Sequence, residues 1–155
     1  MKKISLAVAV IFLMTTFVFA QTSKVVPKKA TISFLKGEVK IQKNKTKTSL
    51  KAKLGVALSE GDKVETGEGS RIELKLYDGS IIRIGENSSM VFEELKEDAG
   101  TMTDVSTIKV LFGRIWLNVK KTIGRKQESK IVTPKVTAAV KGTAYRSDVD
   151  KEGET

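Results

Sequence analysis

The sequence predicts an all-β protein, a single compact domain of short antiparallel strands arranged as a sandwich or a rolled sheet. Apolar and polar residues alternate in short runs, which is the period of a β-strand, and no stretch has the longer period of an amphipathic helix. Gly, Asn and Asp separate the runs, as expected of tight turns. Short strands with turns at this spacing are typical of a sheet that buries one face and leaves the other in water.

The first twenty residues are predicted to be a signal peptide and not part of the fold. Lys2 and Lys3 precede a charge-free apolar stretch, and Val18 and Ala20 occupy the small-residue positions of a cleavage site. Cleavage is expected after Ala20, which gives a periplasmic or secreted protein without a stable membrane span. The alternative is an uncleaved membrane anchor, for which the segment is short.

The rest of the chain is predicted to be a flexible linker over residues 21–29 and one β domain over residues 30–155. The chain has 155 residues and a net charge of +10, of which the two leader lysines contribute two, so the exported form carries +8. The 135 residues that follow the leader suit one hydrophobic core. Without cysteine, an exported protein of this kind depends on packing alone.

The residues that are missing also limit the chemistry. The chain has neither Cys nor His, which excludes an ordinary zinc site and the Ser-His-Asp and Cys-His nucleophile arrangements. A Ser-Lys pair or two carboxylates would remain, but the sequence indicates no residues that converge on such a site. We therefore expect no enzyme activity, no cofactor and no metal.

The first strands are expected directly after the linker. Ile32 and Phe34 are predicted to share one face, and Val39 and Ile41 resume the alternation in a shifted phase. Gly37 lies between the two pairs, and a glycine at a change of phase predicts a β-bulge at that residue.

The clearest hairpin signal is Asp78-Gly79. Alternation before it predicts one strand and alternation after it predicts the returning strand, with inward residues Ile72, Leu74, Leu76, Ile82 and Ile84. The residues expected on the outer face of the first strand are Arg71, Glu73, Lys75 and Tyr77. Asp and Gly tolerate the positive φ angles of a type I′ turn, so a two-residue loop is predicted.

The later strands follow the same logic. Met90 and Phe92 are predicted to carry the next strand. A further strand pair is expected on either side of Gly113, with inward residues Ile108, Val110, Ile115, Leu117 and Val119. Trp116 falls on the opposite face from these residues.

Three segments are predicted not to be strands. A short helical turn is expected near residues 50–58, an acidic loop over residues 93–104, and a basic connection over residues 120–130. The last strand-like segment is interrupted twice, because Pro134 cannot donate to a central ladder and Gly142 permits a bend. Residues 130–133 and 135–140 are therefore expected to be separate pieces, with a restart at Thr143.

These pieces, taken in order, resemble the FecR domain, an exported bacterial β-module. The segments that carry the resemblance are "GEVKIQ", "LSEGDKVETGEGSRIELKLYDGSIIRIGENSSM", "LFGRIWLNV" and "IVTPKVTAAVKGTAYRSDV". The resemblance covers nearly all of the chain after the leader. It implies that certain residues shape turns: Gly61, Asp62, Gly67, Asp78, Gly79, Gly113, Pro134, Gly142 and Thr143.

Physical roles are expected for several of these turn residues. Asp62 and Asp78 are predicted to accept backbone N–H groups within their own turns. A calcium site is the alternative, although no dense set of acidic ligands surrounds them in the sequence. Gly67, Gly79 and Gly113 are expected to adopt φ angles that a Cβ atom would oppose.

The resemblance implies two different functions. Family members of one kind are sigma-factor regulators with a cytoplasmic segment, one membrane span and this module in the periplasm. Here only Met1, Lys2 and Lys3 precede the apolar stretch, so that signalling role is not expected to carry over. The other kind is a free-standing exported module. We therefore expect a binding module for a protein or envelope component, or alternatively a structural protein that binds cell wall, glycan or an anionic surface.

Two surfaces are candidates for binding. Lysines without local acids gather in one short stretch, and the leading candidates are Lys43, Lys45, Lys47, Lys51 and Lys53. Trp116 is expected to be a partly packed surface residue, with a ligand platform as the alternative. Nucleic acid is not an expected partner, because the protein is predicted to be exported and has few aromatic residues for stacking.

The end of the chain suggests a third kind of contact. In the FecR pattern a further strand returns after the segment that ends near Val149, whereas this sequence stops at "DKEGET". Either the chain is a shortened form of a longer protein or the domain closes without that strand. An open edge is then expected to pair with another chain through Thr143, Tyr145 and Val149. Ser147 faces the same side, where the family more often has an apolar residue.

Overall fold

The computed structural model describes residues 24–151, and these residues form strands and turns without a helix. The strands are β1 (Val25–Pro27), β2 (Ala30–Lys36), β3 (Val39–Gln42), β4 (Ser49–Lys51), β5 (Ala57–Leu58), β6 (Lys63–Thr66), β7 (Arg71–Leu76), β8 (Ile81–Ile84), β9 (Ser88–Asp98), β10 (Thr103–Asn118), β11 (Lys126–Val132), β12 (Thr137–Val140) and β13 (Ala144–Val149). The predicted all-β class is confirmed. The predicted signal peptide lies outside the described residues. Across residues 24–151, no helix with the length and apolar character of a membrane span is present.

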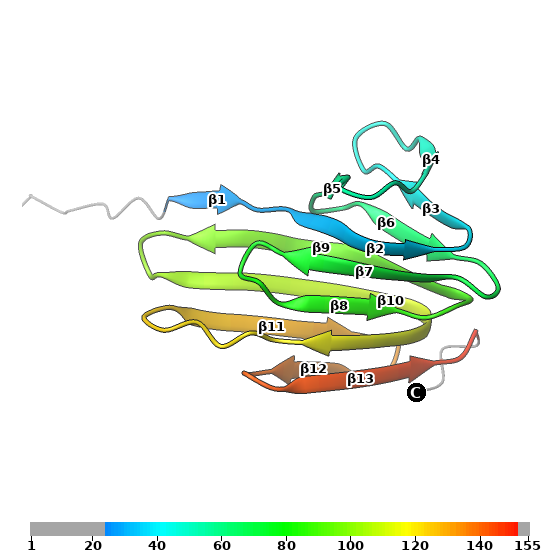
Figure 1. The fold of residues 1–155 in the computed structure, drawn as a ribbon. Coiled ribbons are helices and arrows are strands. Elements are labelled where there is room, and N and C mark those ends of the chain that lie inside the picture. The colour runs from blue at the N-terminus through cyan, green and yellow to red at the C-terminus, as the bar shows by residue number, and fades with distance from the viewer. Residues whose placement is uncertain (1–23, 152–155) are drawn as a thin grey trace, which may run out of the picture.

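The strands form one continuous 13-stranded sheet that curls into two layers (Figure 1). The first layer, sheet A, has the order β4-β3-β6-β9-β10-β11-β12, with β1 paired to the C-terminal end of β9. The second layer, sheet B, has the order β5-β2-β7-β8-β10-β13. Strand β10 belongs to both layers, so the architecture is a rolled sheet.

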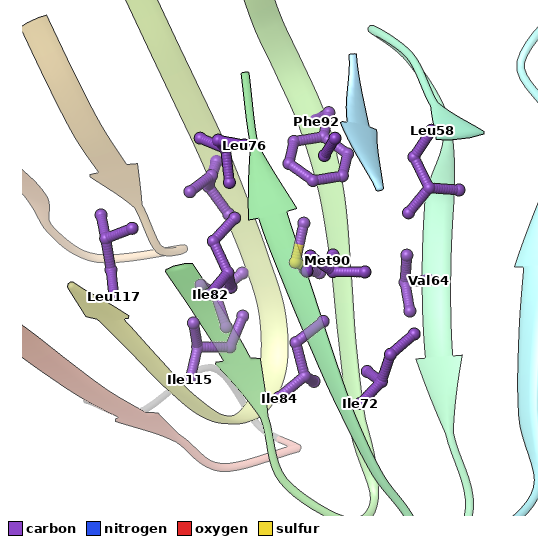
Figure 2. Packing of buried hydrophobic residues seen from close by; sticks show 14 of the residues in the cluster. Leu58, Val64, Ile72, Leu76, Ile82, Ile84, Met90, Phe92, Ile115 and Leu117 are labelled. Carbon is purple, nitrogen blue, oxygen red and sulfur yellow. The ribbon is translucent and has the colours of Figure 1, made fainter. Parts of the chain in front are cut away.

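The hydrophobic core lies between the two layers, where the inward residues of both sheets meet (Figure 2). The alternation predicted for β7 and β8 is confirmed, since Ile72, Leu74 and Ile82 are fully buried while Arg71 and Arg83 are exposed. Val64, Met90 and Phe92 face them from sheet A. The period of two in the sequence thus separates core from surface along each of these strands.

Strand β10 folds back on itself at Gly113. Its first half pairs with β9 and β11 in sheet A, and its second half pairs with β8 and β13 in sheet B. Figure 1 shows the strand reversing at one end of the molecule. Gly113 has φ +95°, and a Cβ atom there would lie 2.2 Å from Ser88 Oγ. Only glycine fits this corner, because both the φ angle and the space exclude a side chain.

This reversal explains a pairing that the sequence did not predict. Strands β10 and β11 are parallel, whereas the other described strand pairs are antiparallel. The chain reverses once at Gly113 and a second time through residues 119–125, so it returns beside the start of β10 in its original direction. Strands β9 and β10 are also much longer than the short strands that we expected, with 11 and 16 residues.

Buried hydroxyl groups join the other corners between the two sheets. Thr66 Oγ1 donates to Gly85 O (2.6 Å) and accepts from the backbone N–H of Ser88 (3.0 Å). Ser88 Oγ accepts from the N–H of Arg114 (2.9 Å), and Ser70 Oγ accepts from the N–H of Glu38 (2.9 Å). Backbone N–H and C=O groups that have no partner in a neighbouring strand at a corner therefore form hydrogen bonds with buried hydroxyl groups.

The bulge predicted at Gly37 is wrong. The register of β2 against β7 shifts at Ser33, between Ile32 and Phe34. The extra residue turns Phe34 outward, so it is 45% exposed and does not share the buried face of Ile32. Gly37 instead lies in the connection that carries the chain from sheet B to sheet A.

The three segments predicted not to be strands contain strands. Residues 50–58 include the end of β4 and all of β5, and they form no helical turn. Residues 93–104 include the C-terminal part of β9 and the start of β10. Residues 120–130 include the start of β11. The acidic and basic segments neutralise each other: Arg125 donates twice to Asp104 (2.9 and 3.0 Å) and pairs with Glu97 (2.8 Å). Each segment has the charge typical of a loop, but in the fold the two segments pair and neutralise each other as strands.

The expected linker over residues 21–29 also contains a strand, because β1 pairs with the end of β9. Lys28 forms an ion pair with Glu97 and lies 5.7 Å from the ring centroid of Tyr77. These contacts hold residues 25–28 against the domain.

The hairpin at Asp78-Gly79 has a three-residue loop and not the predicted type I′ turn. Gly79 has φ +83°, but Asp78 does not have a positive φ. The N–H of Gly79 donates to Leu76 O (2.9 Å), and the N–H of Leu76 donates to Ser80 O (2.8 Å). This pattern is a turn over Tyr77 and Asp78 followed by a glycine bulge. Gly67 also differs from the prediction, because its φ is not positive.

The two interruptions near the end of the chain separate three strands. Pro134 lies in a tight loop between β11 and β12, where Thr133 exchanges hydrogen bonds with Val136. Gly142 lies where the chain passes from β12 in sheet A to β13 in sheet B. Ser147 is buried at 5% exposure, on the inner face, as predicted. Among the described residues, β13 pairs with β10 only, so its other edge is open.

Candidate functional site

The lysines predicted as a binding surface do not all have the same role. Lys43 Nζ lies 2.6 Å from Asp62 Oδ2 and 2.8 Å from Ala57 O. Asp62 is buried and also accepts the backbone N–H groups of Asn44 (3.0 Å) and Ser59 (2.9 Å). Lys43 is therefore a structural residue that anchors the β3–β4 loop.

The remaining four lysines form an exposed group that we call the lysine segment: Lys45, Lys47, Lys51 and Lys53. No ion pair involves any of them within residues 24–151. Lys51 lies directly opposite Lys40 in the β3–β4 ladder, and β4 pairs with no strand other than β3 among those described. The segment is thus a set of exposed charges on an edge strand and the loops beside it, where Lys47 Nζ donates to Asn44 Oδ1 (3.3 Å).

The two predicted turn carboxylates accept hydrogen bonds within the fold. Burial alone would raise the pKa of Asp62, but the hydrogen bonds from Lys43, Ser59 and Asn44 hold it below its ordinary value. Asp78 accepts the N–H and the hydroxyl of Ser80, both at 2.8 Å. The predicted turn roles are confirmed. Within residues 24–151 there is no group of three or more acidic, His or Cys side chains that could hold a metal ion.

A second basic surface lies on the outer face of sheet B, and we call it the arginine face. Its cations are Lys36, Arg71, Arg83, Arg114 and Arg146, and its aromatic residues are Phe34 and Trp116. These side chains line a shallow groove of about 430 Å³. They come from five strands that are adjacent in the sheet, of which only β7 and β8 are also neighbours in sequence.

Cross-strand register arranges the arginine face in two rows. Read across β13, β10, β8, β7 and β2, the first row is Arg146, Trp116, Arg83, Glu73 and Phe34. In the second row, Arg114 lies opposite Asp148 and Arg71 lies opposite Lys36. Gly85 directly follows β8 and lies between the two pairs, since its N–H donates to Arg114 O and the β7–β8 register, continued by one residue beyond Ile84, leads to Arg71. Directly opposite residues in neighbouring strands lie about 5 Å apart, so neighbouring side chains within a row are within reach of one another.

The first row is held together by charge and ring contacts. The guanidinium carbon of Arg83 lies 4.7 Å from the ring centroid of Trp116, and Arg83 Nε donates to Glu73 (2.8 Å). The hydrogen bond from Arg83 lowers the pKa of Glu73, with a further hydrogen bond from Ser33. Trp116 is half-buried and lies between Arg146 and Arg83 in the row, as predicted for a partly packed surface residue.

The second row has an unequal distribution of charge. Arg114 and Arg146 share Asp148, with distances of 3.0 and 2.9 Å. Arg71 and Lys36 lie directly opposite each other, and neither has an ion pair or side-chain hydrogen bond among the described residues. Like charges that face each other across a ladder are unfavourable, so this corner of the face retains uncompensated positive charge.

Of the residues on the arginine face, only Trp116 is a binding candidate from the sequence alone. The four arginines occupy outward positions of strands that the alternation had defined, so each was identifiable as a surface residue. Their convergence depends on strand order, in which β8 and β13 both flank the second half of β10. The two candidates from the sequence, the lysine stretch and Trp116, belong to different sheets.

The fold and the two surfaces together define an all-β module with glycine corners and a basic, aromatic outer face. Residues 62–155 match the FecR protein family, and the chain belongs to this family, which is related to sigma-factor regulation. The match begins at Asp62, so strands β1 to β5 precede it and complete both sheets. No curated protein and no solved structure was found to match the chain.

Proposed function

We propose that this FecR-family chain is a non-catalytic exported module that binds a protein of the cell envelope through the arginine face. The observation that carries the proposal is the composition of that face: four arginines, one tryptophan and one exposed phenylalanine on one side of a sheet. Arg and aromatic residues are enriched at protein interfaces and among the residues that dominate binding energy, whereas Lys is depleted.

The cross-strand contacts also support a protein interface. Arg83 and Trp116 hold each other in place, so fewer side-chain conformations are lost when a partner binds. Export is supported by the charge-free apolar leader and its cleavage positions. Absence of catalysis is supported by the lack of Cys and His, which removes the common nucleophile pairs.

A second function, attachment to an anionic glycan or other anionic envelope surface, is favoured by the lysine segment. Its four lysines are exposed and without acidic partners among the described residues. Such separate charges give weak attraction that falls with salt, which differs from a defined protein complex.

Capture from envelope extract at moderate salt tests the proposal. The bait is compared with an arginine-face variant (Arg71→Gln, Arg83→Gln, Arg114→Gln) and a lysine variant (Lys45→Gln, Lys47→Gln, Lys51→Gln, Lys53→Gln), each checked for folding by circular dichroism. We expect one protein that the wild type and the lysine variant retain and the arginine-face variant loses, and that binds again when purified. Equal retention by all three baits would overturn the proposal. Loss with the lysine variant alone would favour anionic-surface attachment.

A further inference from the structure

The arginine face has a hollow at its centre, over Gly85. Gly85 lies between Arg114 on β10 and Arg71 on β7, and it is the position in the second row without a side chain. Its φ is not in the left-handed region, so the backbone does not require glycine. A Cβ atom there would lie 3.4 Å from Arg114 Cβ and 3.5 Å from Arg114 O, so a side chain at this position would occupy the space beside the arginine. The glycine therefore keeps the groove open between two guanidinium-bearing strands.

The backbone N–H and carbonyl of Gly85, at the floor of the hollow, both have hydrogen-bond partners in the fold. The N–H of Gly85 donates to Arg114 O (2.9 Å), and its carbonyl accepts from Thr66 Oγ1 (2.6 Å). A ligand in the hollow would therefore be recognised by the side chains around it. Those nearest in the row are Arg71 and Arg114, with Lys36 opposite Arg71.

The charges around the hollow favour an anion. The five cations of the arginine face are accompanied by three carboxylates in the surrounding rows and turns, of which Glu86 accepts the N–H of Gly69 (2.8 Å). Arg71 and Lys36 face each other without an acidic partner in the described chain. A bound anion would relieve this repulsion, and a guanidinium can give two parallel N–H bonds to one carboxylate.

The aromatic residues indicate which kind of anion fits. Arg83 lies over the Trp116 ring at 4.7 Å, so this ring face is not free to stack on a sugar. Phe34, 45% exposed at the other end of the first row, offers apolar surface to a neighbouring side chain. A chain that presents carboxylates beside apolar groups matches this surface, and an acidic peptide segment has that chemistry.

We propose that the hollow over Gly85 binds a side-chain carboxylate from an extended acidic segment of a protein partner, with Arg71 and Arg114 on either side. A second carboxylate of the same segment neutralises Lys36. This inference rests on the proposed function and specifies the chemistry of the partner.

The single tryptophan of the chain lies in the same groove and provides a direct readout. The probe is a hexaglutamate peptide with blocked ends, titrated into the protein at low salt while Trp116 fluorescence is recorded. We expect a saturable change that weakens as salt is added. Arg71→Gln should weaken binding by about tenfold, since a lost charge-assisted hydrogen bond is worth about 1.5 kcal/mol or more. Gly85→Val, which fills the hollow, should weaken it at least as much. Lys51→Gln is the matched control and should bind like the wild type.

Three results would overturn the inference. The first is no saturable response to hexaglutamate, and the second is a response that Arg71→Gln and Gly85→Val leave unchanged while both variants remain folded. The third is tighter binding of a uronate oligosaccharide or of phosphatidylglycerol vesicles with the same dependence on Arg71, which would assign the site to a glycan or a membrane. If the arginine face captures an envelope protein but hexaglutamate does not bind, the proposed function stands and this inference fails. If neither is observed, both fail.

Discussion

The lysine segment and the arginine face are both basic, but they differ in how their charges are held. The lysines are close in sequence, and they extend as separate side chains from an edge strand and its loops. The arginines are spread from Arg71 to Arg146, and strand register places them in two adjoining rows with ring and carboxylate contacts.

The difference shows that a cluster in the sequence and a cluster in space have different consequences. Exposed lysines with independent, flexible side chains contribute little individually to binding or stability. Arginines fixed by a tryptophan and by shared carboxylates lose less conformational freedom when a partner arrives. A run of like charge in a β protein therefore says less about function than the outward residues of neighbouring strands.

The largest effect is expected where the second half of β10, which carries Arg114 and Trp116, leaves sheet A. Gly113→Val combines a strained φ with contacts of 2.2–2.4 Å to Ser88, so it should cost about 3–5 kcal/mol of stability. Gly124→Val is the control, since Gly124 also has a positive φ but no atom within 4 Å of a new Cβ. It should cost only about 1–2 kcal/mol. Urea denaturation midpoints of the two variants measure this difference in stability. Equal midpoints would show that a side chain at position 113 does not clash with Ser88.

A smaller loss of stability is expected when Asp62, the partner of Lys43, is changed. Asp62→Ala removes the acceptor for Lys43 and for two backbone N–H groups, and should cost about 2–3 kcal/mol. Lys45→Ala changes an exposed lysine in the same loop and should alter the free energy of unfolding by less than about 0.5 kcal/mol. Thermal unfolding of both variants tests whether Lys43, through Asp62, supports the fold while the lysine segment does not. Similar melting temperatures for the two variants would contradict this difference.

Acid should weaken both regions. The pKa of Glu73 lies below its ordinary value of 4.5, and that of Asp62 below 3.8. As pH falls through these ordinary values, the unfolded state takes up protons before the folded state does, so stability is lost progressively toward lower pH. The melting temperature should therefore decrease below about pH 4.5. In Asp62→Asn the decrease should be shallower, and an unchanged slope would show that Asp62 does not contribute.

Both basic regions end in an edge strand, β4 and β13, and their amides allow a direct comparison. In each strand, the N–H groups that point away from the neighbouring strand should exchange quickly in the monomer, because no described strand covers them. Hydrogen exchange at low protein concentration measures this. Protection of all amides in Ala144–Val149 equal to that in Arg71–Leu76 would show that the edge is covered. It would also contradict the expected strand pairing through Thr143, Tyr145 and Val149.

The smallest effect on stability is expected for the lysine segment itself. Changing Lys45, Lys47, Lys51 and Lys53 to Gln should leave the unfolding free energy within about 0.5 kcal/mol of the wild type, since these are solvated charges. Elution from a cation exchanger should nevertheless move to lower salt. A large loss of stability would show that these lysines have structural partners.

The sequence predicted the strand faces well because burial follows a period of two, as in Ile72, Leu74 and Leu76. It also located the turns at Asp62, Gly79 and Gly142. It did not predict the long β9–β10 hairpin, because charged residues such as Asp104 and Arg125 neutralise each other only after the fold has formed. Strand order, and with it the arginine face, depends on contacts between distant segments that local periodicity does not contain.

The strand common to both sheets has a consequence for how the molecule unfolds. Strand β10 pairs with β9 and β11 in sheet A and with β8 and β13 in sheet B along one uninterrupted backbone. Displacing either layer therefore pulls on the strand that is also part of the other layer. The core and both sheets should therefore melt in a single cooperative transition, without a stable half-folded intermediate. A load applied by a partner on the outer face of sheet B would be carried through Gly113 into sheet A, so the whole domain would resist it as one mechanical unit.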